Sequence, residues 1–340
     1  MLKKKSAKPI LLALFLLIIL SAIATGLVLF GVKTPSTQDG LVFIHHSVGE
    51  NWLNNSLNET LLAKDYIVKV NDITYGVKVF PDNGRPASLP MPSGDYTDME
   101  HWLYWFNDYF DEVQSHNTPT GIYKVVAKLK DRLGVKESNG HSNFNKIVMF
   151  KSCFPNSDIT GDGNEPGDPF SATRTLANYQ AIYRHPNGSG HAYTHNEVTY
   201  KPLEDIFAAH PDTLFIVITA PPLHYAPADA TTNDNAQRAR VFNNWLKSDW
   251  LAQYNTTHPD LNNVAVFDLF NELAYTADVP AHPNRLKAEY GGDSGDSHPN
   301  SAANLHLTQI FATNPDNFLD SAWNAFDKSQ QDAALASLQK

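Results

Sequence analysis

The chain has 340 residues, a formal net charge of -10, and a composition that is 42% apolar and 18% charged. These values are typical of a folded globular protein and exclude a disordered or collagen-like chain. The 26 Lys and Arg residues are outnumbered by 36 Asp and Glu residues, which argues against a general nucleic-acid-binding protein. Cys153 is the only cysteine, so the chain can form neither an internal disulfide nor a zinc site made of several thiolates.

The N-terminus has the pattern of a membrane anchor. Residues 9–32 carry no charge, and four lysines precede them. An apolar run of about 20 residues spans a bilayer as a helix, and its basic flank stays in the cytoplasm. We therefore expect residues 1–32 to form a cytoplasmic flank and one transmembrane helix, residues 33–40 to form a tether, and the rest to lie outside the cytoplasm.

A cleaved signal peptide is the alternative, because Ala22-Ile23-Ala24 fits a small-residue cleavage site. The apolar run continues past this site as far as Phe30, which favours the uncleaved anchor. The rest of the chain is exported in either case. Without the four early lysines it has 22 basic and 36 acidic residues, a net charge of -14, and no electrostatic attraction to anionic lipids or nucleic acid.

Beyond the tether, short apolar runs alternate with longer helical patterns, which is typical of an α/β fold. The runs are continuous and rich in β-branched residues, like strands that are buried on both faces. Right-handed crossovers make such strands into a parallel, doubly wound sheet. We predict a single domain over residues 41–340, with about five strands and flanking helices. The strands are expected at 41–44, 66–70, 146–150, 214–218 and 264–267, and the helices at 51–62, 120–133, 171–183, 236–251, 301–312 and 317–338.

Residues 77–120 form an insertion between the second and third predicted strands. Within it, Thr97-Asp98-Met99-Glu100 fits a capping box that opens a helix, with Thr97 as the cap. An aromatic stripe in such a helix is most often part of the core. The alternative is an aromatic wall for a sugar, with Asp98 and Trp102 as substrate contacts. The stripe consists of Trp102, Trp105, Phe106 and Tyr109.

Residues that can perform chemistry follow the predicted strands, and a doubly wound sheet binds its ligands beyond the carboxyl ends of its strands. The first strand is followed by His45, His46 and Ser47, shortly before a predicted helix. A serine at a helix N-terminus lies where backbone N–H groups stabilise a developing oxyanion. The alternative is an ordinary N-cap serine beside two polar histidines.

The loop before the helix predicted at 301–312 is rich in Gly, Asp and Ser and contains His298. Asp296 lies two residues before this histidine, and Asp293 lies five before it. A general base needs an imidazole whose tautomer is fixed by an acidic or carbonyl partner. The alternative is a solvated surface loop with a capping Asp. We expect the loops after the first and last strands to bring Ser47, His298 and an Asp together at one edge of the sheet.

Two further loops contain candidate oxyanion donors. Gly76 follows the second strand, and a glycine lets its backbone N–H approach a ligand closely. Asn156 follows the third strand, and an asparagine amide that points into the site is a neutral oxyanion donor. Either residue can also be an ordinary turn residue.

Four of these positions, taken in order, resemble the sequence blocks of the SGNH/GDSL hydrolase superfamily, over most of residues 41–313. The chain departs from the family pattern around these positions. His45-His46 stands where Gly-Asp usually precedes the serine, and Ser157 stands where Asp usually follows the asparagine. Gly295 occupies the position three residues before the histidine, where the family has its acid. The four matching positions are Ser47, Gly76, Asn156 and His298.

The resemblance implies an α/β serine hydrolase that cleaves an ester by acyl transfer. His298 would be the base, Asp296 or Asp293 the acid, and the backbone N–H groups of Ser47 and Gly76 with the Asn156 side chain the oxyanion hole. We expect neither a metal nor a cofactor. The expected substrate is an ester-bearing small molecule or polysaccharide, with His46, Asp98 and Trp102 as contacts.

Three other interpretations of these sequence features are possible. The altered residues around Ser47 allow a catalytically silent, surface-anchored glycan-binding module on the same fold. His45, His46, His298 and Asp296 could be the ligands of a metallohydrolase, although adjacent histidines on a strand point to opposite faces. Residues 158–164 resemble a calcium loop, but Pro169 stands where its glutamate ligand should be.

Overall fold

The computed structural model of the chain describes residues 40–74, 97–116, 145–225 and 230–338. The predicted anchor, nearly all of the tether, Gly76, much of the insertion and the helix expected at 120–133 lie outside these ranges. Within the described ranges, no helix has the length and apolar character that a bilayer crossing requires.

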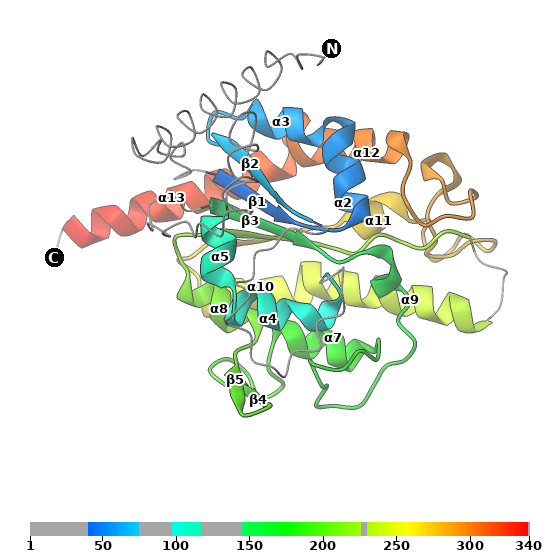
Figure 1. Cartoon of the computed structure of the whole chain (residues 1–340), viewed down its shortest axis with the longest axis horizontal. Coiled ribbons are helices and arrows are strands. Elements are labelled where there is room, and N and C mark those ends of the chain that lie inside the picture. Colours follow the sequence, from blue (N-terminus) through cyan, green and yellow to red (C-terminus); the bar gives the residue numbers. More distant parts are fainter. Residues whose placement is uncertain (1–39, 75–96, 117–144, 226–229, 339–340) are drawn as a thin grey trace, which may run out of the picture. The chain divides into compact units, whose positions relative to one another are not determined.

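Five parallel strands form a sheet with the order β2-β1-β3-β6-β7 (Figure 1). The first strand, β1, pairs with β2 on one side and β3 on the other, so the strand order reverses at its carboxyl end. Such a reversal is where ligand sites of open α/β sheets form. The predicted parallel α/β sheet is confirmed. Its strands are β1 (Gly40–Ile44), β2 (Lys69–Ile73), β3 (Asn145–Lys151), β6 (Leu214–Ile218) and β7 (Val264–Phe267).

Helices cover both faces of the sheet, because alternate strand side chains point to opposite faces. Val42, Val148 and Val217 pack into one core, and Leu41, Ile147 and Ile216 pack into the other. The first core is covered by α4 (Trp102–Asn107), α5 (Phe110–Ser115), α7 (Leu176–Tyr183), α8 (Leu203–Ala209), α9 (Ala230–Trp245) and α10 (Leu251–Thr257).

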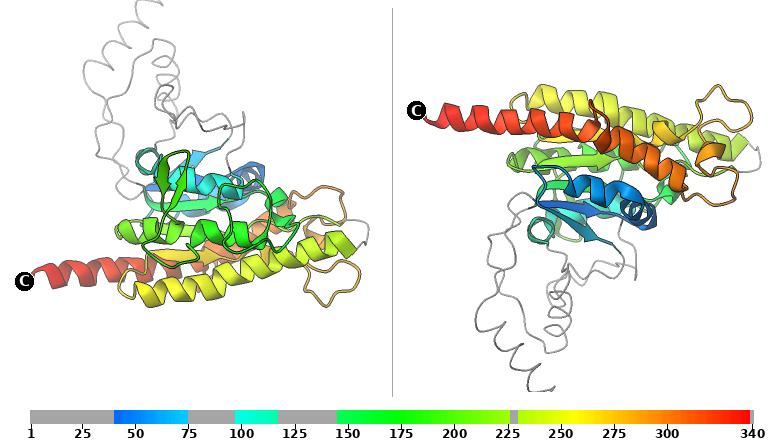
Figure 2. Two further views of the ribbon diagram at one scale, coloured as in Figure 1. Left: turned by 90° about the horizontal axis from the view of Figure 1, so that it is seen from below. Right: turned by 90° about the horizontal axis from the view of Figure 1, so that it is seen from above.

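The second core is covered by helices from both ends of the described chain. Figure 2 shows that the last and longest of them, α13, runs along the same edge of the sheet as α9. These helices are α2 (Ser47–Trp52), α3 (Asn58–Leu62), α12 (Ser301–Thr308) and α13 (Phe318–Leu338).

Several helices and strands have other bounds in the structure than the sequence predicts. Strand β2 starts three residues later than expected, so Asp72 lies within the strand rather than after it. The first helix starts at Ser47 instead of near Asn51, while α7 starts at Leu176 instead of Ser171. A hairpin, α8 and α11 were not predicted, because these elements are too short to show a clear periodicity. The hairpin consists of β4 (Tyr193–His195) and β5 (Val198–Tyr200), and α11 spans Leu269–Leu273.

The capping-box prediction is wrong. The helical segment opens with a 3₁₀ turn at Met99–His101, after Asp98 as the N-cap residue, and no side chain caps it. The Asp98 carboxylate instead accepts a hydrogen bond from the Asn156 amide at 2.8 Å.

The four aromatic residues of the stripe are buried, so the core interpretation is confirmed. Trp102 is 0% exposed, packs on the Phe150 ring at 4.8 Å, and donates its indole N–H to the Ser152 hydroxyl at 2.9 Å. A side chain without exposed surface cannot form a wall for a sugar. The expected contact between Trp102 and a substrate is therefore wrong.

Glu204, in the first turn of α8, makes stability depend on pH. Its side chain is 4% exposed, and no described residue donates a hydrogen bond to its Oε1. Burial, with a smaller contribution from Asp205, raises the pKa of Glu204 from 4.5 to about 7. Between these values the unfolded chain has lost the proton that the folded chain keeps. The free energy of unfolding therefore falls as the pH rises from about 4.5 to about 7, by at most roughly 3 kcal/mol.

Glu204→Gln should remove this dependence, because the amide stays neutral at every pH. Urea unfolding at pH 5 and pH 8 should show a smaller decrease in stability for the variant than for the unmodified protein. Glu59→Gln, at an exposed position on α3, is the matched control and should leave the decrease unchanged. An equal decrease in Glu204→Gln and the unmodified protein would contradict the assignment.

Candidate active site

Ser47 is the first residue of α2, two residues after β1 ends. His46 is the N-cap residue, with an extended backbone and no side-chain capping bond. The first N–H groups of a helix have no partner within the helix. The Ser47 N–H therefore lies at the carboxyl edge of the sheet, where it can stabilise an anion. Ser47 does not act as an N-cap, so that alternative is wrong.

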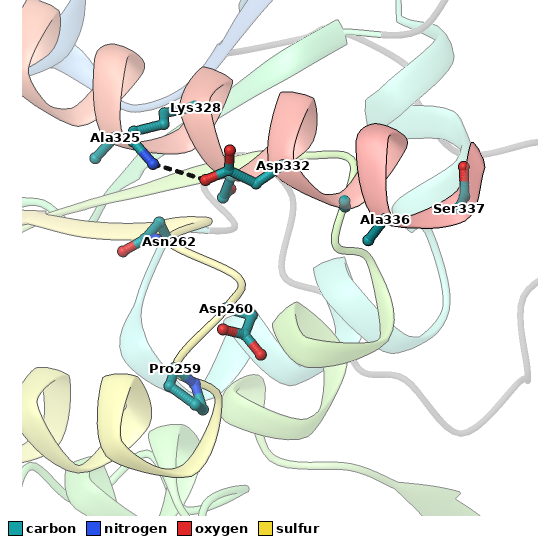
Figure 3. Close-up of a pocket in the computed structure, with 10 residues that line it drawn as sticks. Pro259, Asp260, Asn262, Ala325, Lys328, Asp332, Ala336 and Ser337 are labelled. Atoms are coloured by element: carbon teal, nitrogen blue, oxygen red, sulfur yellow. Dashed lines mark hydrogen bonds and ion pairs between the residues drawn. The ribbon is translucent and has the colours of Figure 1, made fainter. Parts of the chain in front are cut away.

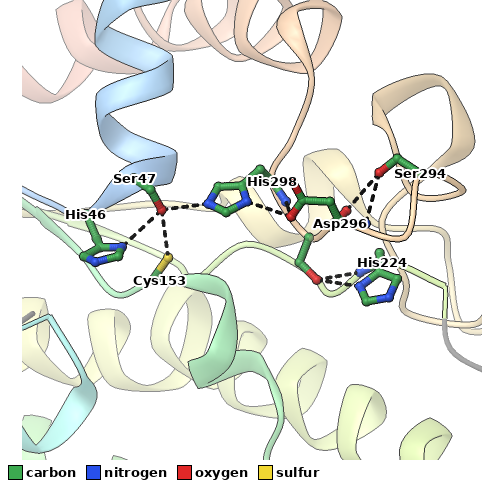
Figure 4. A network of polar contacts seen from close by, with 8 residues as sticks. His46, Ser47, Cys153, His224, Ser294, Asp296 and His298 are labelled. Carbon is green, nitrogen blue, oxygen red and sulfur yellow. Dashed lines mark hydrogen bonds and ion pairs between the residues drawn. The ribbon is translucent and has the colours of Figure 1, made fainter.

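The Ser47 hydroxyl begins a continuous chain of polar contacts (Figure 4). Its Oγ lies 2.8 Å from His298 Nε2, and His298 Nδ1 lies 2.7 Å from Asp296 Oδ1. An ionised carboxylate can only accept, so His298 Nδ1 carries a proton and the neutral ring offers its Nε2 lone pair to the serine proton. This is the arrangement of a Ser-His-Asp triad.

The structure distinguishes the two candidate acids. Asp296 contacts His298 through both the ring and the backbone N–H, whereas the described contacts of His298 do not include Asp293. The hydrogen bond from His298 holds the pKa of the Asp296 carboxyl below its usual value, so this group is ionised at neutral pH. Gly295, directly before Asp296, has a φ of 79°, in the left-handed region that glycine adopts readily.

The loop with Asp296 and His298 is held by residues that the sequence analysis did not identify. The hydroxyl of Ser297, between the acid and the base, lies 2.8 Å from His224 Nδ1 and accepts the His224 backbone N–H at 3.2 Å. His224 belongs to the loop that follows β6. Downstream, Asn300 caps α12 by accepting the Ala303 N–H at 3.0 Å. Hydrogen bonds therefore hold the chain on both sides of His298, at Ser297 and at Asn300.

Cys153 lies beside Ser47, two residues after β3, with its Sγ 3.8 Å from Ser47 Oγ. Burial raises the pKa of the Cys153 thiol, but a hydrogen bond with His46 and the positive charge of Lys151 outweigh it, and the pKa is lowered overall. The surroundings of Ser47 Oγ therefore favour a negative charge.

Asn156 is 2% exposed, and all of its polar atoms have partners. The amide nitrogen donates to Asp98 Oδ1 at 2.8 Å and to the Cys153 carbonyl at 3.3 Å. The amide oxygen accepts the Met99 N–H at 3.0 Å and the Tyr179 hydroxyl at 3.2 Å. In this arrangement the Asn156 side chain links the turn after β3 to Asp98 and Met99, which precede α4. Its oxyanion role stays a prediction, as does that of Gly76, which lies outside the described residues.

His45 directly follows β1, and its described contacts do not include Ser47. It is 1% exposed, its Nε2 lies 2.7 Å from Asp72 Oδ1, and its Nδ1 lies 2.9 Å from the His46 carbonyl. The two adjacent histidines therefore have different partners. Across the described ranges, no group of three or more His, Cys, Asp and Glu side chains is arranged to hold a metal ion.

The calcium-like loop at 158–164 is tied to α9. Asp158 accepts a hydrogen bond from the Asn235 amide at 2.8 Å, and Asp162 pairs with Arg238 at 2.9 Å. These two carboxylates are satisfied by protein side chains.

Gly49 allows His45 to pack beneath the start of α2. A Cβ atom at Gly49 would lie 2.4 Å from the His45 Cβ, far inside van der Waals contact. Gly49→Ala should therefore lower the free energy of unfolding by about 1–3 kcal/mol, measured by urea unfolding. Gly161→Ala is the matched control, because its nearest neighbour would lie at 3.8 Å. Equal stability of the two variants would contradict this packing.

The structure also has a hollow of about 770 Å³ between α13 and the loop before β7 (Figure 3). That loop leads into the amino end of β7, so the hollow lies at the edge of the sheet opposite to Ser47. Its charged residues Lys328 and Asp332 pair with each other at 2.6 Å. The residues that line it include Pro259, Asp260, Asn262, Lys328, Asp332 and Ser337, which contain no nucleophile with a base. The candidate active site is therefore the triad.

A comparison of the chain with protein-family models finds no match, and a comparison with curated protein sequences finds none either. The resemblance to SGNH/GDSL hydrolases therefore stays a prediction from the residues. The function has to be inferred from the geometry of the triad.

Proposed function

We propose that this protein is a serine hydrolase that cleaves an ester by acyl transfer. The observation that carries the proposal is the contact chain Ser47–His298–Asp296, with distances of 2.8 and 2.7 Å. Both distances are within the range expected for a nucleophile, its base and the acid that orients the base. The order Ser, Asp, His along the chain and the position after β1 agree with the SGNH type.

The chemistry follows from the contacts. Ser47 Oγ bonds to the ester carbonyl carbon while its proton passes to His298 Nε2, and the carbonyl oxygen becomes an oxyanion. Asp296 holds the imidazole and stabilises its charged form. The carbonyl re-forms as the alcohol leaves with the proton from His298. A water molecule then repeats the cycle on the acyl-enzyme and releases the acid.

The site lies in a favourable electrostatic position for this reaction. The N–H of Ser47 at the start of α2 points to the edge of the sheet where the oxyanion forms, and the positive end of the helix dipole acts there as well. Despite its burial, the Cys153 thiol at 3.8 Å from Ser47 Oγ has a lowered pKa because of a hydrogen bond with His46 and the charge of Lys151, and these two groups would also favour a negative charge at Ser47.

The substrate class in this proposal is an ester without further specification. A polysaccharide substrate was expected from the export signal and the aromatic stripe, and the side chains of the stripe belong to the core. Export and anchoring by residues 1–32 are part of the proposal on the pattern of charge and hydropathy alone.

A fluorophosphonate probe tests the proposal, because it bonds covalently to an activated serine. The full-length protein should gain one adduct at Ser47 by mass spectrometry and should hydrolyse p-nitrophenyl acetate. Ser47→Ala should do neither. Absence of both adduct and hydrolysis in the unmodified protein would contradict the proposal and favour the catalytically silent glycan-binding module.

A further inference from the structure

The Ser47 oxygen is flanked by two imidazoles. His298 Nε2 lies at 2.8 Å and His46 Nδ1 at 3.1 Å, with the Cys153 thiol at 3.8 Å. Figure 4 shows His46 and His298 on opposite sides of the hydroxyl, one before α2 and the other from the loop before α12. The catalytic cycle described above uses only one of these rings.

The hydrogen-bond capacity of the serine determines what the second ring does. A hydroxyl has one proton to donate and can accept two further hydrogen bonds. The Ser47 proton points to His298 Nε2, because Asp296 keeps the His298 proton on Nδ1. His46 Nδ1 can then contact Ser47 Oγ only as a donor. The geometry therefore puts a proton on Nδ1 of His46.

We propose that His46 is a further catalytic residue, whose Nδ1–H stabilises the negative charge that forms on the substrate oxygen. This inference rests on the proposed serine hydrolase activity. His298 must face the leaving alcohol, since it returns the proton to that group. The oxyanion forms away from the leaving alcohol, and His46 provides a donor on the side of Ser47 opposite to His298. Donors placed in advance at this position contribute strongly to acyl transfer.

The contacts of Asn156 argue against its amide as the oxyanion donor, and the backbone of His46 holds its ring in place. Both hydrogens of the Asn156 amide are engaged, with Asp98 and with the Cys153 carbonyl. The backbone of His46 is fixed, because its carbonyl accepts the Glu50 N–H at 3.0 Å and lies 2.9 Å from the His45 ring nitrogen. A donor on a fixed backbone needs no reorganisation when the charge develops.

The attack of Ser47 on the ester needs no proton donor or acceptor besides His298 and His46. The bond between Ser47 Oγ and the carbonyl carbon forms as one carbonyl bond pair moves to oxygen, and the serine proton goes to His298. The His46 proton stays on Nδ1 and only changes its acceptor, from the serine oxygen to the oxyanion. His46 therefore acts as a hydrogen-bond donor, and His298 as the base.

The experiment compares three substitutions of His46 in the full-length chain. An Asn side chain places an amide N–H close to the position of imidazole Nδ1, whereas a Gln side chain places it further out. We expect His46→Ala and His46→Gln to lower kcat for p-nitrophenyl acetate by about 10²-fold or more, with KM changed by less than about threefold. His46→Asn should recover at least about tenfold of this loss. His191→Ala, at an exposed histidine, is the matched control and should leave kcat unchanged.

The results separate this inference from the function on which it depends. An unchanged kcat in His46→Ala, or an effect of this substitution on KM alone, would overturn the donor role of His46. The proposed hydrolase activity would be unaffected by either result. Equal activities of His46→Asn and His46→Gln would also overturn the donor role, and this comparison remains valid if His46→Ala does not fold. An unmodified protein without esterase activity or a Ser47 adduct would overturn both proposals.

Discussion

Ser47→Ala should lower kcat for p-nitrophenyl acetate by about 10⁴–10⁶-fold and abolish labelling by a fluorophosphonate probe. The reason is that Ser47 Oγ is the group in contact with the base His298, at 2.8 Å, and alanine has no atom to form the acyl-enzyme. Hydrolysis that remains should come only from the groups that polarise the ester. The measurement is steady-state kinetics together with intact-mass analysis of the labelled protein.

Ser301→Ala is the matched control for this substitution. Ser301 is the first residue of α12, is exposed, and lies three residues beyond the base. Its removal should leave both kcat and labelling unchanged. An adduct on Ser47→Ala, or activity within about tenfold of the unmodified protein, would show that another residue is the nucleophile.

Asp296→Asn should lower kcat by about 10³–10⁴-fold, while Asp293→Asn should have little effect. The Asp296 carboxylate accepts the His298 Nδ1 proton at 2.7 Å and thereby keeps the Nε2 lone pair directed at Ser47. An asparagine amide can donate to Nδ1 instead, which leaves the proton on Nε2 and blocks its role as base. Asp293 is exposed on the same loop and has the same side chain, so it is a closely matched control.

The pH dependence gives this prediction a second test. The hydrogen bond from His298 lowers the pKa of Asp296, so its carboxylate is lost only as the pH falls below the usual range of an Asp. Asp296 should therefore be ionised at both about pH 6 and about pH 8, and the large loss of kcat in Asp296→Asn should be present at both pH values. A larger effect of Asp293→Asn than of Asp296→Asn would assign the acid to Asp293 instead.

The sheet could be predicted from local patterns, because strands buried on both faces leave continuous apolar runs. Residues 214–218 and 264–267 are strands with the predicted bounds, and the other three lie within a few residues of their predicted positions. The places of Ser47 and His298 follow from the same rule, since chemistry in a doubly wound sheet collects where its strands end. Asn300 caps α12 through a local contact, since a cap depends on neighbouring residues alone.

The roles of side chains within the site depended on contacts between distant segments. The spacing of Asp293 and Asp296 from the histidine left both possible, and the turn at Gly295 selects Asp296. Asn156 occurs at the position expected for an oxyanion donor, yet its amide is drawn to Asp98, 58 residues away. Trp102 fits both a core and a sugar-binding wall by periodicity, and burial against β3 decides for the core.

The amino-acid sequence alone was enough to predict a parallel α/β sheet and to show which strand ends carry a serine, a histidine and an aspartate. Periodicity and turn chemistry are local properties, so they can be read without the fold. The contacts of the folded chain show that Asp296 lies against His298, that His224 and Ser297 hold the loop, and that His46 lies beside the serine oxygen. Hydrogen bonds depend on separation and direction between atoms, and for segments as far apart as Ser47 and His298 these quantities exist only after folding.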